Sequence, residues 1–182
     1  MKKLLIVTGD LATGKSTFSN ILSERYECCS LCKDRIKELL ADSVGFSSRE
    51  ENLHLSIAAV EMMIHSFSQM ARCGHNLILE ANFKENELKK IREIADDFGY
   101  STLTLVFRAN IDIIYRRFVN RIDNENRHPA HLSGFDGYDT FKYYIDNGRQ
   151  QATFGEVIHI NADDFSYQSD ERILSKIDDF FE

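Results

Sequence analysis

Short apolar runs alternate with amphipathic segments along the whole chain of 182 residues. The runs are rich in Leu, Ile and Val, and each is followed by a polar or helical segment, as is typical of buried parallel strands. They predict strands at residues 3–8, 28–32, 76–81, 101–107 and 156–161. Because strands separated by helices usually form a parallel sheet with helices on both faces, we expect an α/β fold.

Between the predicted strands, apolar residues recur at the three- and four-residue spacing of amphipathic helices. We expect four such stripes to be the core faces of helices: Leu53, Ile57, Val60, Ile64 and Phe67; Leu88, Ile91, Ala95 and Phe98; Ile111, Ile114 and Phe118; and Ile173, Ile177 and Phe180.

One long polar segment, residues 123–140, interrupts this pattern and contains the single proline of the chain, Pro129. It has the length and composition of a mobile insertion rather than of a domain boundary. We therefore expect one domain that spans residues 1–182.

The stretch between the first predicted strand and the first helix matches the phosphate-binding motif G-x-x-x-x-G-K-S/T. Its glycines let the backbone curl around phosphates, and N–H groups at a helix N-terminus donate to an anion. Lys15 can then reach the β- and γ-phosphates, and the Ser16 hydroxyl can bind Mg²⁺. The motif predicts that a nucleoside triphosphate binds to Gly9, Asp10, Leu11, Ala12, Thr13, Gly14, Lys15, Ser16 and Thr17.

The composition narrows the kinds of binding partner and the cellular compartment that we expect. The net charge of −7 argues against a general affinity for the nucleic-acid backbone. No apolar stretch approaches the ~20 residues of a membrane span, so we expect a cytoplasmic protein. The cysteines fit that compartment: Cys29-x-x-Cys32 lacks the second ligand pair of a zinc site, and buried small hydrophobes are expected rather than a disulfide.

In a parallel sheet, chemistry gathers at the carboxyl ends of the strands. Asp34 follows the second strand, where its carboxylate can accept the proton of a substrate hydroxyl that attacks the γ-phosphate. Arg35 or Lys37 can hold an anionic substrate or the transferring group. The alternative is that Asp34 is the N-cap of a helix that begins near Arg35, and the two roles do not exclude each other.

Two further strand ends carry polar residues. Glu80 follows the third strand, where an acid often binds Mg²⁺ through water, and Asn82 can hydrogen-bond the substrate. The alternative is a capped strand end without a ligand. Asn161 ends the last strand, where we expect a loop to contact the nucleotide base.

Arginines precede and enter the polar insertion. Arg117 and Arg121 are four residues apart on one predicted helix face, where they can stack on adenine and clamp phosphate oxygens. Arg127 can close over the γ-phosphate. A solvated basic face is the alternative. We do not expect His128 and His131 to bind a metal, because no carboxylate partner is near in the sequence.

Taken together, the phosphate loop, Asp-x-Ile-Lys after the second strand, the acid and Asn after the third, and the arginines resemble those of the small P-loop kinases. This group includes polynucleotide 5′-kinases, zeta-toxin-like kinases and chloramphenicol phosphotransferases. The resemblance covers nearly the whole chain. It implies a three-layer P-loop NTPase fold, like that of nucleoside and nucleotide kinases. The five-stranded sheet would have the order 2-3-1-4-5, with a helical lid over ATP at about residues 122–138.

The same resemblance implies roles for single residues. Asp34 becomes the general base, Arg117 the lid arginine near the base of the nucleotide, and Arg121 and Arg127 the phosphate-clamping arginines. Lys37 departs from the group, which often has Arg at that position, and a lysine lacks the bidentate guanidinium.

These expectations predict an ATP- and Mg²⁺-dependent kinase that phosphorylates a hydroxyl of a small molecule. A polynucleotide 5′-hydroxyl kinase and a slow or non-catalytic nucleotide-binding regulatory module are the alternatives. We expect the acceptor pocket to lie among the helices of residues 35–72, with a partly apolar wall that includes Leu53, His54, Met62 and Met63.

Overall fold

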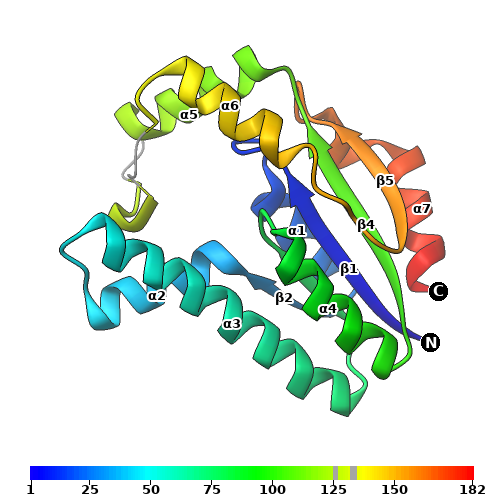
Figure 1. The fold of residues 1–182 in the computed structure, drawn as a ribbon. Coiled ribbons are helices and arrows are strands. Elements are labelled where there is room, and N and C mark those ends of the chain that lie inside the picture. The colour runs from blue at the N-terminus through cyan, green and yellow to red at the C-terminus, as the bar shows by residue number, and fades with distance from the viewer. Residues whose placement is uncertain (125–126, 132–134) are drawn as a thin grey trace.

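Five parallel strands form one sheet in the structure, a computed structural model that describes residues 1–124, 127–131 and 135–182 (Figure 1). The strand order is β2-β3-β1-β4-β5, which confirms the predicted order. Each predicted strand is confirmed with ends that differ by at most one residue: β1 Lys2–Gly9, β2 Cys29–Cys32, β3 Leu77–Glu80, β4 Tyr100–Arg108 and β5 Glu156–Asn161.

Helices cover both faces of the sheet, which gives the three layers of an α/β fold (Figure 1). The described α-helices are α1 Lys15–Arg25, α2 Lys33–Val44, α3 Arg49–Cys73, α4 Glu85–Asp97, α5 Ile111–Asn124, α6 Tyr138–Gly148 and α7 Glu171–Phe181. Two short 3₁₀ helices are η1 Pro129–His131 and η2 Ser166–Ser169.

The central strand β1 explains why the strands are continuous apolar runs. Leu5 and Val7 face a core shared with α1, α5 and α7, whereas Leu4 and Ile6 face a core shared with α3 and α4. All four side chains are fully buried. Since both faces of the strand are covered by helices, no alternation of polar and apolar residues is needed.

The predicted core face of α3 is wrong in its first half. Leu53 and Ile57 are about half exposed, at 54% and 51%, and the buried residues there are Leu55 and Ala59. This part of α3 packs against α2 rather than against the sheet, so its buried stripe is rotated relative to that of the second half. Val60, Ile64 and Phe67 do face the core, as predicted.

The prediction of buried cysteines is also wrong. Cys29 and Cys73 are exposed, and Cys28 and Cys32 are half-buried. The physical reason is position: β2 is the edge strand of the sheet, and Cys73 ends α3. All four thiols are free. Burial is the main cause that raises the pKa of Cys28 to about 11.

The polar segment 123–140 contains the end of α5, helix η1 and the start of α6. The mobility of this segment stays a prediction, and its residues 125–126 and 132–134, Gly134 among them, lie outside the described residues.

Over the described ranges, no helix combines the length and the apolar character needed to cross a membrane.

Candidate active site

The loop between β1 and α1 has a backbone path that requires its two glycines. Gly9 has φ +118°, and a Cβ there would collide with the backbone of Phe107 on the neighbouring strand β4. Gly14, the N-cap of α1, has φ +83°. Both values lie in the region that glycine adopts without steric cost, so the motif's spacing fixes the shape of the loop.

Hydrogen bonds hold the loop in this shape. The Thr13 hydroxyl donates to the carbonyl of Asp10 at 2.8 Å, and the Tyr167 hydroxyl donates to the carbonyl of Thr13 at 2.8 Å. Lys15 Nζ donates to the carbonyl oxygens of Asp10 at 2.5 Å and Gly9 at 3.2 Å. The ammonium group is therefore held inside the curve of the loop.

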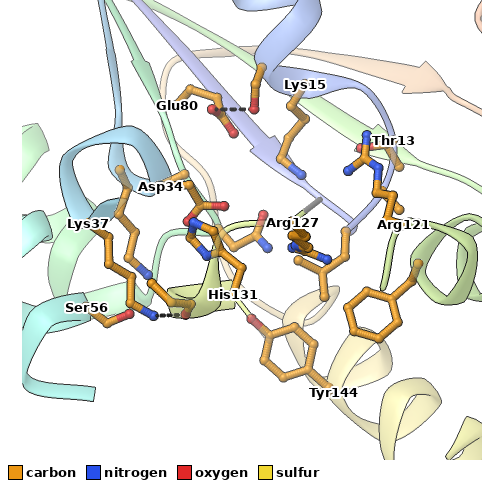
Figure 2. Close-up of a pocket in the computed structure, with 18 of the residues that line it drawn as sticks. Thr13, Lys15, Asp34, Lys37, Ser56, Glu80, Arg121, Arg127, His131 and Tyr144 are labelled. Carbon is orange, nitrogen blue, oxygen red and sulfur yellow. Dashed lines mark hydrogen bonds between the residues drawn. The ribbon is translucent and has the colours of Figure 1, made fainter. Parts of the chain in front are cut away.

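Ser16 and Glu80 meet beside Lys15. The Ser16 hydroxyl donates to Glu80 Oε2 at 3.0 Å, although the two residues lie on α1 and at the end of β3 (Figure 2). Glu80 is 5% exposed. A hydroxyl and a carboxylate are the hard oxygen ligands that suit Mg²⁺, which usually completes its shell with phosphates and water. The role of Glu80 in binding Mg²⁺ stays a prediction, as does the alternative of a capped strand end.

The pKa of Lys15 depends on the groups that surround it. Burial lowers the pKa of the Lys15 ammonium, and the carboxylates of Glu80, Asp34 and Asp10 act in the opposite direction. A buried cation among carboxylates and backbone N–H groups is a site where an anion such as a phosphate can be bound.

A cavity of about 810 Å³ joins this loop to the helices α2 and α3 and to the segment that follows α5 (Figure 2). It brings together most of the predicted site residues: Leu11, Ala12, Thr13, Gly14, Lys15, Ser16, Thr17, Asp34, Lys37, Glu80, Asn82, Arg121 and Arg127. The predicted residues that do not line it are Gly9, Asp10, Arg35, Arg117 and Asn161.

Asp34 lies in the first turn of α2, and Figure 2 shows its side chain pointing into the cavity that Lys15 enters from another side. The alternative that Asp34 is an N-cap is wrong, because α2 begins at Lys33 and its N-cap residue is Cys32. The side chain is therefore not used for capping.

Of the two basic residues predicted after Asp34, only Lys37 lines the cavity. The Arg35 side chain is 80% exposed, pairs with Glu38 at 3.3 Å and does not line the cavity, so it is not in place to bind a substrate there. Lys37 does line the cavity, but its Nζ donates to the carbonyl of Ala130 at 2.8 Å. Its ammonium thus connects α2 to helix η1.

Helix η1 is held against α2 and α3 by this contact and others. The carbonyl of Ala130 also accepts a hydrogen bond from Asn52 Nδ2 at 3.1 Å. The Ala130 side chain is fully buried in a small cluster with Ala41 and Leu55. Helix η1 is thus anchored by both apolar and polar contacts.

The two histidines of η1 and its flank bind carboxylates of α2. His128 Nε2 lies 3.0 Å from Asp42 Oδ1, and His131 Nε2 lies 3.2 Å from Glu38 Oε1 without the alignment of a hydrogen bond. Over the described ranges, no group of three or more His, Cys, Asp or Glu side chains is arranged to hold a metal ion. Burial lowers the pKa of His131.

Of the three arginines predicted to contact the nucleotide, Arg121 and Arg127 line the cavity. The guanidinium carbon of Arg127 lies 5.5 Å from the ring centre of Phe118. Figure 2 shows Arg127 near the middle of the cavity and Arg121 on the side of the phosphate loop. Two cations from α5 and from the segment after it are thus near Lys15, where phosphate charge would be bound.

Arg117 has a different position. Its guanidinium donates to the carbonyls of Ala162 at 2.7 Å and Asp163 at 2.6 Å and lies 4.4 Å from the ring centre of Phe165. It therefore joins α5 to the loop after β5, so a solvated basic face is wrong for this residue. Asn161 is exposed, and its Oδ1 accepts from the backbone of Asp163 at 2.9 Å.

Asp10 and Arg149 form an ion pair that sequence reasoning missed. Arg149 Nη2 lies 2.5 Å from Asp10 Oδ2, and the Asp10 side chain is 3% exposed. The Asp10 carboxylate also accepts from the backbone N–H of Ala109 at 3.1 Å. The side chain of Asp10 is therefore bound within the protein, and its backbone N–H donates to the carbonyl of Phe107 at 2.8 Å, so Asp10 shapes the loop rather than presenting a free donor to a phosphate.

The cavity wall on α3 also differs from the prediction. Leu53 lines it, together with Asn52 and Ser56, but His54, Met62 and Met63 do not. Tyr144 of α6 closes another side (Figure 2). No signal in the sequence pointed to Asn52, Ser56 or Tyr144, because each is a common residue in an amphipathic helix.

The fold and the loop define the chain as a P-loop NTPase protein with an α/β fold. Residues 4–138 match a family described as an AAA domain, and the chain belongs to that family. Its resemblance to small P-loop kinases is thereby confirmed for family and fold. A search of the curated proteins found no significant match.

Solved structures share this fold. A kinase candidate from Chloroflexus aurantiacus is 25% identical, with a TM-score of 0.87 over 100% of this chain and 99% of that chain. The tunicamycin resistance protein of Deinococcus radiodurans is 16% identical, with a TM-score of 0.64 over 97% and 96%. The APS kinase of Mycobacterium tuberculosis, solved with AMPPNP and APS, is 18% identical, with a TM-score of 0.62 over 97% and 96%. The last two likenesses concern the fold alone.

Proposed function

We propose that the protein is an ATP-dependent kinase that transfers the γ-phosphoryl group to a hydroxyl of a small molecule. The observation that carries this proposal is the single cavity that holds both the phosphate loop and Asp34. A nucleotide-binding loop alone suits many functions. A carboxylate just after β2, on the far side of the same cavity, suits transfer to a second substrate.

In this mechanism, the loop N–H groups and Lys15 bind the β- and γ-phosphates. Ser16, and Glu80 through water, would hold Mg²⁺, which when bound neutralises charge on the phosphates. Arg121 and Arg127 stabilise the negative charge of the transferring group. All of these side chains line the same cavity, which supports the roles given to them.

Asp34 accepts the proton of the acceptor hydroxyl as its oxygen attacks the γ-phosphorus. One P–O bond forms to the acceptor, and the bond between the γ-phosphorus and the β–γ bridging oxygen breaks, so that ADP leaves. The segment with Arg127 covers the site and limits the access of water, which favours transfer over hydrolysis.

We also propose that residues 1–182 form one domain, which contains the whole site. The proposal names a small-molecule acceptor rather than a nucleic acid. The side of the cavity near Asp34 is lined by residues of both charges. A polynucleotide backbone would require a stripe of basic residues instead.

The test is a screen of acceptor-dependent ADP formation with ATP and Mg²⁺. Sugars, nucleosides, aminoglycosides, chloramphenicol and an oligonucleotide with a 5′-hydroxyl serve as acceptors, and Lys15→Ala is the control. We expect at least one small molecule to stimulate ADP formation and to gain a phosphoryl group, and the control to show neither. ADP formation that no acceptor stimulates would contradict the proposal.

A further inference from the structure

The side of the cavity near Asp34 contains hydrogen-bond acceptors that have no partner within the described residues. Asn52 Oδ1 and Asn82 Oδ1 are buried atoms without a hydrogen bond, and both residues line the cavity. Asn52 is 6% exposed. A buried polar atom without a partner lowers stability, so native proteins rarely keep one unless it serves a function such as ligand binding.

The amide of Asn52 has a defined orientation. Its Nδ2 donates to the carbonyl of Ala130, which is also bound by Lys37. A carbonyl oxygen can only accept a hydrogen bond, so the amide nitrogen must face it. The amide oxygen is consequently fixed on the opposite side, where it can accept a hydrogen bond but cannot donate one.

Asn82 reaches the cavity from the end of β3. The phenol of Tyr144 lies beside it, and burial is the main cause that raises the pKa of that phenol. Figure 2 shows Tyr144 at the edge of the cavity, with Asp34 on the same side as Lys37 and Ser56. Two amide oxygens and the carboxylate of Asp34 thus come from three separate elements to one cavity, and all three are acceptors.

The charges on this side are mixed rather than concentrated for an anionic group. Lys37 is held by the carbonyl of Ala130, and Arg35 lies outside the lining. The other charged lining residues from α2 and α3 include both signs, namely Lys33, Arg49, Asp34 and Glu50. A phosphate or carboxylate on the acceptor would meet amide oxygens that repel it, whereas hydroxyl groups would satisfy them.

We infer that the acceptor is a neutral, polyhydroxylated small molecule such as a sugar or a cyclic polyol. One hydroxyl lies at Asp34 and is phosphorylated, and neighbouring hydroxyls donate to Asn52 Oδ1 and Asn82 Oδ1. This inference rests on the proposed function for the reacting hydroxyl. The binding of the other hydroxyls depends only on the cavity.

The experiment measures binding by calorimetry in the presence of ADP and Mg²⁺. The probes are pentoses, hexoses and inositol, each compared with its monophosphate, its amino analogue and its deoxy analogues. We expect at least one neutral polyol to bind about 10-fold or more tightly than its monophosphate and its amino analogue. A deoxy analogue that lacks a contacting hydroxyl should lose about 10-fold or more in affinity. Tighter binding of a phosphorylated, carboxylated or amino compound would overturn the inference.

A pair of variants tests the assigned contact. Asn82→Leu keeps the approximate volume and removes the amide oxygen, and it should weaken polyol affinity about 10-fold or more while nucleotide affinity is kept. Ser30→Ala is the matched control, because Ser30 Oγ is also buried without a partner but lies on β2, outside the lining. Equal effects of the two variants on polyol affinity would overturn the assignment.

The two proposals fail in different ways. If a polyol binds but gains no phosphoryl group, the inferred class of ligand stands and the kinase proposal fails. If an anionic small molecule or an oligonucleotide is phosphorylated and no polyol binds, the kinase proposal stands and the inferred class is wrong.

Discussion

At the residue scale, the proposed chemistry depends on Asp34, whose carboxylate lines the cavity from the first turn of α2. Because its side chain makes no capping contact, its role can be tested without loss of a structural hydrogen bond.

The variant Asp34→Asn keeps the size of the side chain and removes its ability to accept the proton. We expect acceptor phosphorylation to fall ~10²-fold or more, with little change in ATP affinity. The melting temperature should also change little, since an exposed charge–dipole interaction contributes only about 0.3–1 kcal/mol. Steady-state kinetics and thermal melting measure both. An unchanged rate with a lower melting temperature would assign Asp34 a structural role instead.

At the element scale, helix η1 connects the two sides of the site. Lys37 and Asn52 hold its Ala130 carbonyl, and the same segment carries Arg127 into the cavity. Lys37 is thus a positioning residue that acts through η1. The same contact explains why a lysine serves here in place of the arginine that is common at this position, because one carbonyl oxygen needs no bidentate donor.

The variant Lys37→Met keeps the aliphatic stem and removes the ammonium. We expect faster hydrogen exchange in residues 127–131, no change in α7, and a drop of about 10-fold or more in kcat that exceeds any change in the KM of ATP. Hydrogen exchange by mass spectrometry and kinetics measure these effects. Unchanged exchange in residues 127–131 would show that Lys37 does not hold η1.

The burial of His131 makes the attachment of η1 sensitive to pH. Burial is the main cause that lowers the pKa of His131, although Asp34 and Glu38 oppose it and Lys37 and Arg127 reinforce it. An unfolded histidine titrates near about 6.5. As pH falls below that value, the unfolded chain binds a proton more readily than the folded protein, so stability decreases.

The measurement compares thermal melting of the wild type and His131→Asn at about pH 7.5 and about pH 5.5. Carboxylates remote from His131 contribute equally to both proteins. We expect the wild type to lose more stability on acidification than the variant does. Equal losses would show that His131 does not contribute to the pH dependence.

At the scale of the whole molecule, the sequence predicts the parts that depend on local patterns. The five strands and the loop around Lys15 follow from short apolar runs and from a motif in which each residue type has a steric or electrostatic reason. The strand order follows from the resemblance to small P-loop kinases.

The sequence does not predict contacts between distant elements. The Asp10–Arg149 pair joins residues 139 positions apart, and the binding of Lys37 to Ala130 spans 93 positions. The rotated buried face of α3 has the same cause, because it depends on how α2 packs there. Such contacts are set by tertiary packing, which no local pattern encodes.

The most direct test of the account is the fate of the γ-phosphoryl group of γ-labelled ATP, measured with Mg²⁺ and the best acceptor of the screen. We predict that the wild type transfers the label to the acceptor, that Asp34→Asn does so ~10²-fold more slowly, and that Lys15→Ala does not transfer it. Release of the label only as inorganic phosphate would contradict the account and indicate a nucleotide-hydrolysing module.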